Sequence, residues 1–284
     1  MTPTLVRQHL PHAGAAPRVD LRARARDWSE IQERMLVPLY EAVHERLDVG
    51  PATRLLGLGC GSGLALLMAA ARGAAITGVD SSPERMTFAR ERLRPEAWGT
   101  RARAEARLVE GSPRDAAVPG APAYTLVTAF EPIGCLAGDS EGMSGLLAEA
   151  TPLAERGAAV VLAGWGPPER CATTSVLRVA TKLAEPLRST GSWRPALRDD
   201  LEDVAQRAGL KPDGSGRVAC PFGYADVDSA VRGLKSTGLF DAAMTATDQA
   251  QVDKELTEAL HPHQRQDGTV WMPNVFRYLI ARVP

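Results

Sequence analysis

A glycine-rich run and the acidic residue that follows it carry the clearest chemical signal in this sequence. Gly59, Gly61 and Gly63 alternate with single residues at the end of the run Leu55–Gly63, between an apolar segment and a second apolar stretch. Glycine lets a backbone turn tightly and approach a ligand where a Cβ would clash. Asp80 ends the next apolar run, where a carboxylate can accept hydrogen bonds from both hydroxyls of a ribose. The pattern predicts a site for a nucleoside-type ligand.

The glycine spacing is GxGxG and not the GxGxxG of dinucleotide-binding proteins, because the third glycine position of that motif is Leu64 or Ser62 in this chain. A structural alternative is a plain strand-to-helix turn, with Asp80 capping the next helix. Ser82 and Pro83 are indeed typical of a helix start. The order of strand, glycine turn, helix, strand and acidic residue favours the nucleoside interpretation.

Short apolar runs alternate with helical stretches along much of the chain, which predicts an α/β fold with a mostly parallel, doubly wound sheet. The predicted strands are Arg54–Leu58, Ala75–Val79, Ala106–Glu110, Tyr124–Ala129, Ala158–Ala163, Arg217–Pro221 and Val275–Arg282. The predicted helices between the early strands are Leu64–Ala71, Pro83–Leu93 and Met143–Ala154.

Further helical stretches exceed what such a sandwich needs, and we expect them to cap the carboxyl ends of the strands. They are Thr174–Leu187, Val227–Leu239 and Thr247–Leu260. An amphipathic stretch over Asp27–Leu47, interrupted at Pro38, precedes the first strand. We therefore expect an N-terminal arm over residues 1–26 and a single domain over 27–284, with cap helices drawn from 27–47, 172–190 and 226–262.

Composition narrows the functional class. The 284 residues carry a net charge of −1, which argues against a dedicated nucleic-acid or anionic-membrane binder. No apolar run approaches the roughly 18–20 residues that span a bilayer, and the N-terminus lacks a signal-peptide core, so a soluble, cytoplasmic protein is expected. The four cysteines lie far apart, and His261 and His263 complete no common ligand set, so neither disulfides nor a metal are expected.

Four stretches together resemble the class I S-adenosylmethionine-dependent methyltransferases, closest to bacterial small-molecule enzymes of specialised metabolism. They are Leu55–Gly63, the segment 78–82 with the helix after it, the strand 124–130 and the strand 157–165. The resemblance implies a Rossmann-like sheet of seven strands whose last strand runs antiparallel. It also implies S-adenosylmethionine as cofactor, S-adenosylhomocysteine as product and a small-molecule acceptor.

The resemblance assigns cofactor-binding roles to individual positions. The glycines would face the methionine part, Asp80 would hold the ribose, Ser81 or Ser82 would lie beside the adenine, and Phe130 with Glu131 would line the methionine side. Trp28 would cover the cofactor. The complete set of expected cofactor-binding residues is Gly57, Gly59, Gly61, Gly63, Asp80, Ser81, Ser112, Phe130 and Trp28.

Two positions depart from the family pattern. Gly57 stands where the family usually has an acidic residue, and Ser112 follows Gly111 where the family often has an aspartate that contacts the adenine. Losing both carboxylates would weaken cofactor binding, although Ser112 can still accept a hydrogen bond. An alternative function is therefore a cyclase or isomerase on the same fold that binds S-adenosylmethionine without consuming it. A nucleoside sensor is a third possibility.

The acceptor is expected to be small and apolar or aromatic, because aromatic residues concentrate in the predicted cap region: Trp165, Trp193, Phe222, Tyr224, Trp271 and Phe276. Their alternative role is ordinary core packing. Glu131 and His261 are the candidate general bases, with His263 as a variant of the second. The other histidines, His9, His12 and His44, are expected to face solvent, as is an arginine-rich face that includes Arg90 and Arg92. The protein is expected to be a monomer or homodimer.

Overall fold

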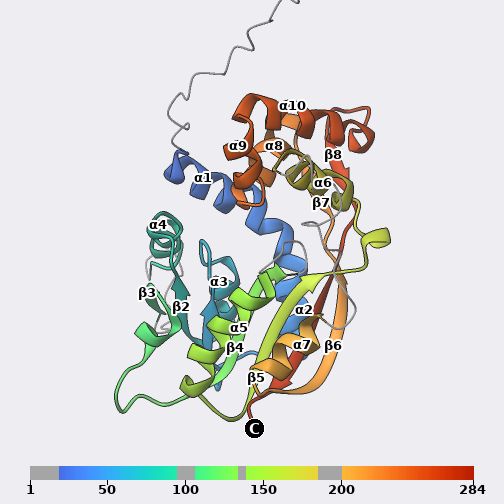
Figure 1. Ribbon diagram of the computed structural model, residues 1–284. Coiled ribbons are helices and arrows are strands. Elements are labelled where there is room, and N and C mark those ends of the chain that lie inside the picture. The colour runs from blue at the N-terminus through green and yellow to red at the C-terminus, as the bar shows by residue number, and fades with distance from the viewer. Residues whose placement is uncertain (1–18, 95–105, 134–138, 185–199) are drawn as a thin grey trace, which may run out of the picture.

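The computed structural model describes residues 19–94, 106–133, 139–184 and 200–284 (Figure 1). Its strands are β1 Arg54–Leu58, β2 Ala75–Asp80, β3 Ala106–Glu110, β4 Tyr124–Ile133, β5 Ala154–Trp165, β6 Lys211–Ala219, β7 Phe222–Tyr224, β8 Val270–Met272 and β9 Val275–Arg282. Its α-helices are α1 Leu21–Asp27, α2 Val37–Arg46, α3 Leu64–Ala71, α4 Pro83–Arg92, α5 Asp139–Ala150, α6 Thr173–Ala184, α7 Asp200–Arg207, α8 Val227–Ser236, α9 Asp241–Ala246 and α10 Gln249–Leu260.

Within the described residues, seven strands form one sheet in the order β3-β2-β1-β4-β5-β9-β6. The pairs from β3 to β5 are parallel, and β9 runs antiparallel to both β5 and β6. The predicted α/β fold of Rossmann-like methyltransferase type, with its antiparallel last strand, is confirmed. The strand order reverses between β1 and β4, which is where open parallel sheets bind their ligands.

Helices cover both faces of this sheet. On one face α3 contacts β2 and α2, and α4 contacts β2 and β3; on the other, α5 and α7 contact each other and the strands β4, β5 and β9. Each face buries its own apolar cluster, one around Leu55 and Ile76 and the other around Leu56 and Val127. Leu55 and Leu56, which are neighbours on β1, point to opposite faces because side chains alternate along a strand.

A helical layer lies over the carboxyl ends of the parallel strands (Figure 1). In it α6, α8, α9 and α10 pack on one another, and the short antiparallel pair β7–β8 joins α8. The prediction drew this cap from 27–47, 172–190 and 226–262. Part of the first range behaves differently, because α2 packs against α3 and β6 on the face of the sheet.

The N-terminal helical stretch begins earlier than predicted and is irregular. Helix α1 begins at Leu21, where the Asp20 side chain accepts hydrogen bonds from two backbone N–H groups, so residues 21–26 of the expected arm are helical. A π-helical turn over Trp28–Gln32 and a 3-10 turn over Glu33–Leu36 then connect α1 to α2. The predicted interruption at Pro38 is found as the start of α2, where proline costs no hydrogen bond.

Most predicted boundaries hold to within a few residues, but some elements were missed. Strand β6 begins at Lys211, six residues before the predicted start, because this edge strand is polar and glycine-containing where no hydrophobic pattern marks it. The short elements α7, α9, β7 and β8 were not predicted either. The elements α9, β7 and β8 have six residues or fewer, which is too few for a clear hydrophobic pattern. Helix α7 was missed although its buried residues Leu201, Val204 and Ala205 have helical spacing.

His44 is buried, which corrects the expectation that it faces solvent. It is 0% exposed on α2 and lies edge-on to the Phe130 ring, with ring centroids 6.1 Å apart. Within the described part of the chain, neither ring nitrogen of His44 has a hydrogen-bond partner. Burial, helped by the nearby Arg72 charge, lowers the pKa of His44 to about 4. His9 and His12, which were also expected to face solvent, lie outside the described residues.

This burial predicts a loss of stability in mild acid. The unfolded chain takes up a proton at His44 near pH 6.5, whereas the folded chain does so only near pH 4. The contribution is therefore complete above pH 6.5 and falls by about 3 kcal/mol between pH 7 and pH 4. Urea unfolding of His44→Leu should show a decline with pH that is shallower by this amount. His261→Gln, on the surface, is the control, and equal declines in wild type and His44→Leu would show that the burial of His44 has no such effect.

Candidate functional site

The glycine loop joins the end of β1 to α3 and is held to the end of β2. Gly59, Gly61 and Gly63 have φ values of 57°, 58° and 81°, in the left-handed region that favours glycine. The Gly61 amide donates a 2.8 Å hydrogen bond to Asp80 Oδ2, and the Ser82 amide donates a 2.9 Å hydrogen bond to Asp80 Oδ1. The sequence-predicted glycines and the predicted ribose-binding carboxylate are thus brought together.

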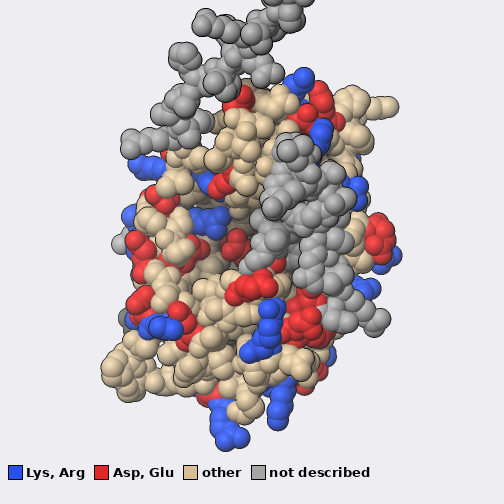
Figure 2. Space-filling model, in the orientation of Figure 1, with Lys and Arg blue, Asp and Glu red and all other residues tan. Residues whose placement is uncertain are grey.

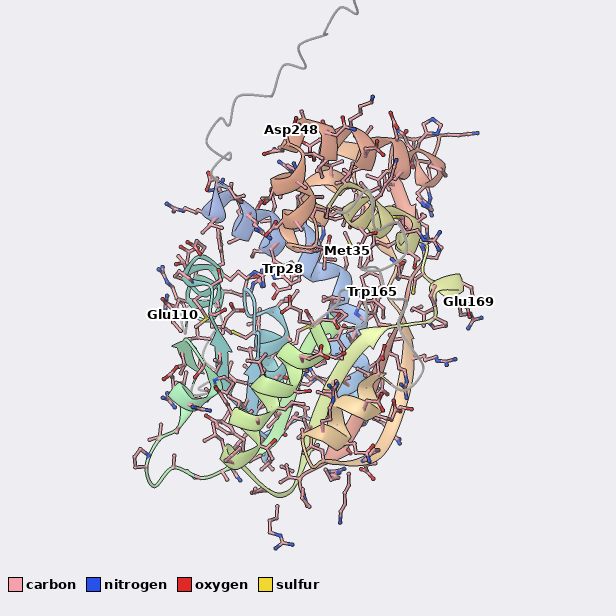
Figure 3. All side chains as sticks on the ribbon, in the orientation of Figure 1. Trp28, Met35, Glu110, Trp165, Glu169 and Asp248 are labelled. Carbon is pink, nitrogen blue, oxygen red and sulfur yellow. The ribbon has the colours of Figure 1, made fainter. Side chains whose placement is uncertain are left out.

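Trp28 lies directly over this loop (Figure 3). A Cβ on Gly61 would stand 2.9 Å from Trp28 Nε1, so only glycine permits this contact without a shift. The Trp28 indole N–H is buried and has no hydrogen-bond partner among the residues that the structure describes. The cavity beneath has a volume of about 20 Å³, which is room for about one water molecule. We call the space between Trp28 and the loop the cleft.

The cleft is lined mainly by residues from the two strands at the switch point and from the N-terminal helical stretch. Tyr40 and Phe130 pack together with ring centroids 4.8 Å apart and form an apolar wall. The full lining is Trp28, Glu33, Leu36, Tyr40, Gly57, Leu58, Gly59, Cys60, Gly61, Leu66, Arg85, Thr128, Phe130 and Glu131. Among the residues that sequence analysis missed, Tyr40 and Leu36 gave no signal beyond helical periodicity.

Two opposite charges face the cleft. Glu131, next to Phe130 on β4, places Oε2 3.4 Å from the position a Cβ on Gly59 would occupy. Arg85, in the first turn of α4, stacks its guanidinium on Trp28, with Cζ 4.5 Å from the ring centroid. Glu131 is exposed to solvent on one side and lines the cleft on the other. This partial burial raises the pKa of its carboxyl, while the Arg85 charge lowers it and the Asp80 charge raises it further.

Glu33 connects the helical stretch to the glycine loop. It is 2% exposed and accepts hydrogen bonds from Ser62 Oγ and, at 3.3 Å, from the Leu64 amide at the start of α3. Arg92 Nη1 lies 2.5 Å from Glu33 Oε2 and also donates to the Ser62 carbonyl oxygen at 2.9 Å. This Glu33–Arg92 network fixes the loop and its cover relative to each other.

Arg92 therefore corrects the expectation of a solvated arginine face. Its side chain is 21% exposed, and its Nη2 also donates to Ser29 Oγ at 2.9 Å. Arg90, two residues earlier, behaves as predicted: it is 49% exposed and lies 3.4 Å from Glu110. Helix position alone separates the two, because α4 turns Arg92 toward the glycine loop and Arg90 toward solvent.

The two departures from the family pattern have different structural settings. At Gly57 a Cβ would approach within 2.9 Å of Leu66 Cδ2, so the Leu66 side chain fills the space that an acidic residue would need. At the end of β3, Ser112 begins a short 3-10 turn and its amide donates to Asp115 Oδ2 at 2.8 Å. A carboxylate three residues further along thus reaches the position that follows Gly111.

Several predicted site residues lie outside the cleft. Ser81 is exposed, and Ser82 caps α4 by accepting a hydrogen bond from the Arg85 amide at 3.2 Å. Ser112 is half-buried at the end of β3. His261 is exposed beyond the end of α10, and His263 contributes to a separate surface pocket beside α6. The structure thus brings Glu131 to the cleft but not His261.

The aromatic residues expected near the acceptor form mainly a packed cluster between the sheet and the cap. Trp165 lies 4.6 Å from Phe276 and 5.9 Å from Phe222, and Phe222 lies 6.4 Å from Tyr224, all between ring centroids. Trp271 is 39% exposed and stacks with Arg265 instead. Trp193 lies outside the described residues. Core packing therefore accounts for the four clustered rings.

In the parts of the chain that the structure describes, no helix is long and apolar enough to cross a membrane. Over the same residues, no group of three or more His, Cys, Asp or Glu side chains is arranged to hold a metal ion. Cys60, Cys171 and Cys220 are free thiols.

A protein-family comparison matches residues 55–151, about a third of the chain, to the model described as a methyltransferase domain. The matched region runs from β1 through α5 and contains the glycine loop and Asp80. No curated protein matches the sequence.

Solved structures show the same fold at low sequence identity. A SAM-dependent methyltransferase from Thiobacillus denitrificans in complex with S-adenosyl-L-homocysteine is 17% identical, with a TM-score of 0.53 over 94% of this chain and 99% of that one. One from Geobacter sulfurreducens, also with S-adenosyl-L-homocysteine, is 17% identical, with a TM-score of 0.51 over 92% and 98%. The [4+2]-cyclase SpnF is 15% identical, with a TM-score of 0.51 over 87% and 80%.

The Glu33–Arg92 network predicts a large stability difference between two neighbouring arginines. Arg92→Met leaves the buried Glu33 carboxylate without its cation, which should lower the free energy of unfolding by about 3 kcal/mol. Arg90→Met removes only an exposed ion pair and should cost less than about 0.5 kcal/mol. Urea denaturation of both variants measures the difference. Similar small losses in both would contradict a buried network.

Proposed function

We propose that this chain, which has the class I S-adenosylmethionine-dependent methyltransferase fold and carries a methyltransferase domain over residues 55–151, binds S-adenosylmethionine and methylates a small molecule. The observation that supports this most directly is the joined geometry of the glycine loop and Asp80. The loop lies at the switch point between β1 and β4, and its Gly61 amide is hydrogen-bonded to the Asp80 carboxylate.

The residues present fit such a cofactor. Each Asp80 oxygen accepts one backbone hydrogen bond and keeps acceptor capacity for the hydroxyls of a ribose. The orphaned Trp28 N–H offers a donor to an oxygen of the ligand. Asp115 lies at the end of β3, where the adenine of the cofactor would be expected. The 20 Å³ cavity is smaller than a nucleoside, so in this proposal the cofactor occupies more than this cavity.

The chemistry asks the protein for alignment and for exclusion of water more than for acid–base catalysis. Bound S-adenosylmethionine would supply an electrophilic methyl group on a sulfonium. Positive charge disappears at that sulfur as the methyl is transferred, so a dry, well-oriented site favours the reaction. Trp28 covers the loop, and Tyr40, Leu36 and Phe130 give the cleft an apolar wall. Such a wall suits this requirement.

The acceptor in this proposal is a small apolar or aromatic metabolite, such as an intermediate of specialised metabolism. The apolar wall of the cleft supports it. So does the surface charge, because Figure 2 shows acidic and basic side chains interspersed over the visible face, without the single-sign surface that nucleic acid requires. If a general base assists, Glu131 is the candidate at the cleft. His261, exposed beyond α10, would need a large movement to reach it.

A second candidate is a cyclase or isomerase that binds the cofactor without consuming it. It is favoured by Gly57, because the Leu66 side chain occupies the space where the family usually has an acidic side chain, and a cyclase shares this fold. Release of S-adenosylhomocysteine separates the two functions. One equivalent per turnover supports methyl transfer, and turnover without release supports the second candidate.

Cofactor binding is predicted to depend on Asp80. Calorimetry with S-adenosylhomocysteine should give a dissociation constant at least about tenfold higher for Asp80→Asn than for wild type, because the charged acceptor for the ribose hydroxyls is lost. Glu155→Gln, exposed at the start of β5 and so at the opposite end of the sheet, is the control and should bind as wild type does. Labelled S-adenosylmethionine with a panel of apolar acceptors tests the transfer itself. If wild type binds neither S-adenosylhomocysteine nor S-adenosylmethionine, the proposed function is refuted.

A further inference from the structure

Tyr40 adds one hydroxyl group to the otherwise apolar wall of the cleft. The residue is 3% exposed and lines the cleft together with Leu36 and Phe130. Among the residues that the structure describes, none forms a hydrogen bond with the Tyr40 hydroxyl. A hydroxyl on a buried ring that lacks a partner costs free energy, because it loses hydrogen bonds to water and gains none in return. A ligand oxygen at this point of the wall would restore one.

A second buried tyrosine has such a partner inside the protein. Tyr224 is 2% exposed, and its hydroxyl donates a 2.9 Å hydrogen bond to Gln32 Oε1. This bond joins the cap to the N-terminal helical stretch, and Tyr224 is not among the residues that line the cleft. The hydroxyl of Tyr224 therefore has a structural role, whereas that of Tyr40 is left for a ligand.

Tyr40 lies on the side of the sheet away from Asp80. Its ring packs on Phe130 of β4, and helix α2, which carries it, contacts β6. Asp80 ends β2, and β1 lies between β2 and β4 in the strand order. In the proposed function, a cofactor whose ribose is held by Asp80 reaches β4 with its methionine end. The acceptor is then expected on the side of β4 and β6, where Tyr40 lies.

The Tyr40 hydroxyl keeps its proton in this setting. Burial raises the pKa of Tyr40 well above its ordinary value, and the charge of Glu33 raises it further against the opposing charge of Arg92. A neutral hydroxyl can donate a hydrogen bond to an oxygen, which has lone pairs. A hydrocarbon has no lone pair, and an alkylamine that is protonated near neutral pH has none to offer either.

We propose that the Tyr40 hydroxyl is a specificity-determining contact that donates a hydrogen bond to an oxygen of the acceptor. This inference rests on the proposed function and deepens it. The acceptor is then an apolar molecule that carries a phenol, enol or alcohol oxygen, and not a hydrocarbon or an amine. Leu36 and Phe130 hold the apolar part of such a molecule, and Tyr40 selects those that bear the oxygen.

Stability without any ligand gives the first test. Tyr40→Phe keeps the ring and removes a hydroxyl that has no partner, so its urea midpoint should be at least that of wild type. Tyr224→Phe is the matched control and should lower the midpoint, because the Gln32 oxygen loses its donor. If Tyr40→Phe lowers the midpoint as much as Tyr224→Phe does, the Tyr40 hydroxyl has a structural role and the subsite is overturned.

Two pairs of probes that differ by one oxygen test the contact itself, by calorimetry on the protein loaded with S-adenosylhomocysteine. The pairs are 4-propylphenol with propylbenzene and naphthalen-2-ol with naphthalene. Tyr40→Phe should raise the dissociation constants of the two phenols about fivefold and leave those of the two hydrocarbons within about twofold. Tyr224→Phe should change the phenol and the hydrocarbon of each pair by the same factor.

Binding of the cofactor product separates the remaining outcomes. Tyr40→Phe should bind S-adenosylhomocysteine within about twofold of wild type, and a loss as large as that of the phenols would show that the hydroxyl contacts the cofactor and would overturn the subsite. Equal changes for phenols and hydrocarbons, or no binding of the phenols to loaded wild type, would overturn it while cofactor binding stands. If wild type does not bind S-adenosylhomocysteine at all, the proposed function fails and the subsite with it.

Discussion

The hydrogen bond between the Gly61 amide and the Asp80 carboxylate is the contact on which the rest of the site depends. It ties the end of β1 to the end of β2 and holds the loop in the left-handed conformation that leads into α3. Because Asp80 also accepts from the Ser82 amide, the same carboxylate sets the start of α4. One buried side chain thus positions both helices whose first turns border the cleft, and it does so with oxygens that still have acceptor capacity.

The cover of the cleft is held by a second buried carboxylate. Glu33 lies where the π-helical turn of the N-terminal stretch meets the 3-10 turn. Its carboxylate accepts a hydrogen bond from the Leu64 amide at the end of the glycine loop and pairs with Arg92. A regular helix shows one face to the core, whereas this stretch is sandwiched between the cap and the sheet. Gln32, the neighbour of Glu33, is uncharged and accepts a 2.9 Å hydrogen bond from the Tyr224 hydroxyl on the cap side. Helical irregularity of this kind often accompanies function.

The charged groups at the site are of two kinds: those that hydrogen-bond to the glycine loop or to each other, and those that line the cleft. Glu33 and Arg92 neutralise each other in the interior, and Asp80 is stabilised by amides. Glu131 and Arg85 line the cleft together with the apolar wall of Tyr40 and Phe130.

Much of the fold was predictable because it is encoded locally. The runs that became β1, β3 and β9, and the helix α3, have the predicted bounds, and the glycine spacing with Asp80 located the cleft. These signals are hydrophobic periodicity and backbone conformations that only glycine adopts readily. The polar edge strand β6 lacks such periodicity and was predicted too short, and the six-residue helix α9 was missed. Helix α7 was missed although Leu201, Val204 and Ala205 have helical spacing.

The sequence by itself determined most of the strands, the helix α3, the glycine loop and the Asp80 carboxylate. Each of these depends on residues that are neighbours in the chain. Only the tertiary structure decided which charges meet there. Glu33 and Arg92 lie 59 residues apart, and nothing local distinguishes Arg92 from Arg90 or predicts that His44 is buried. Such outcomes are decided when separate elements pack and exclude water from some polar groups and not from others, so no window of sequence contains them.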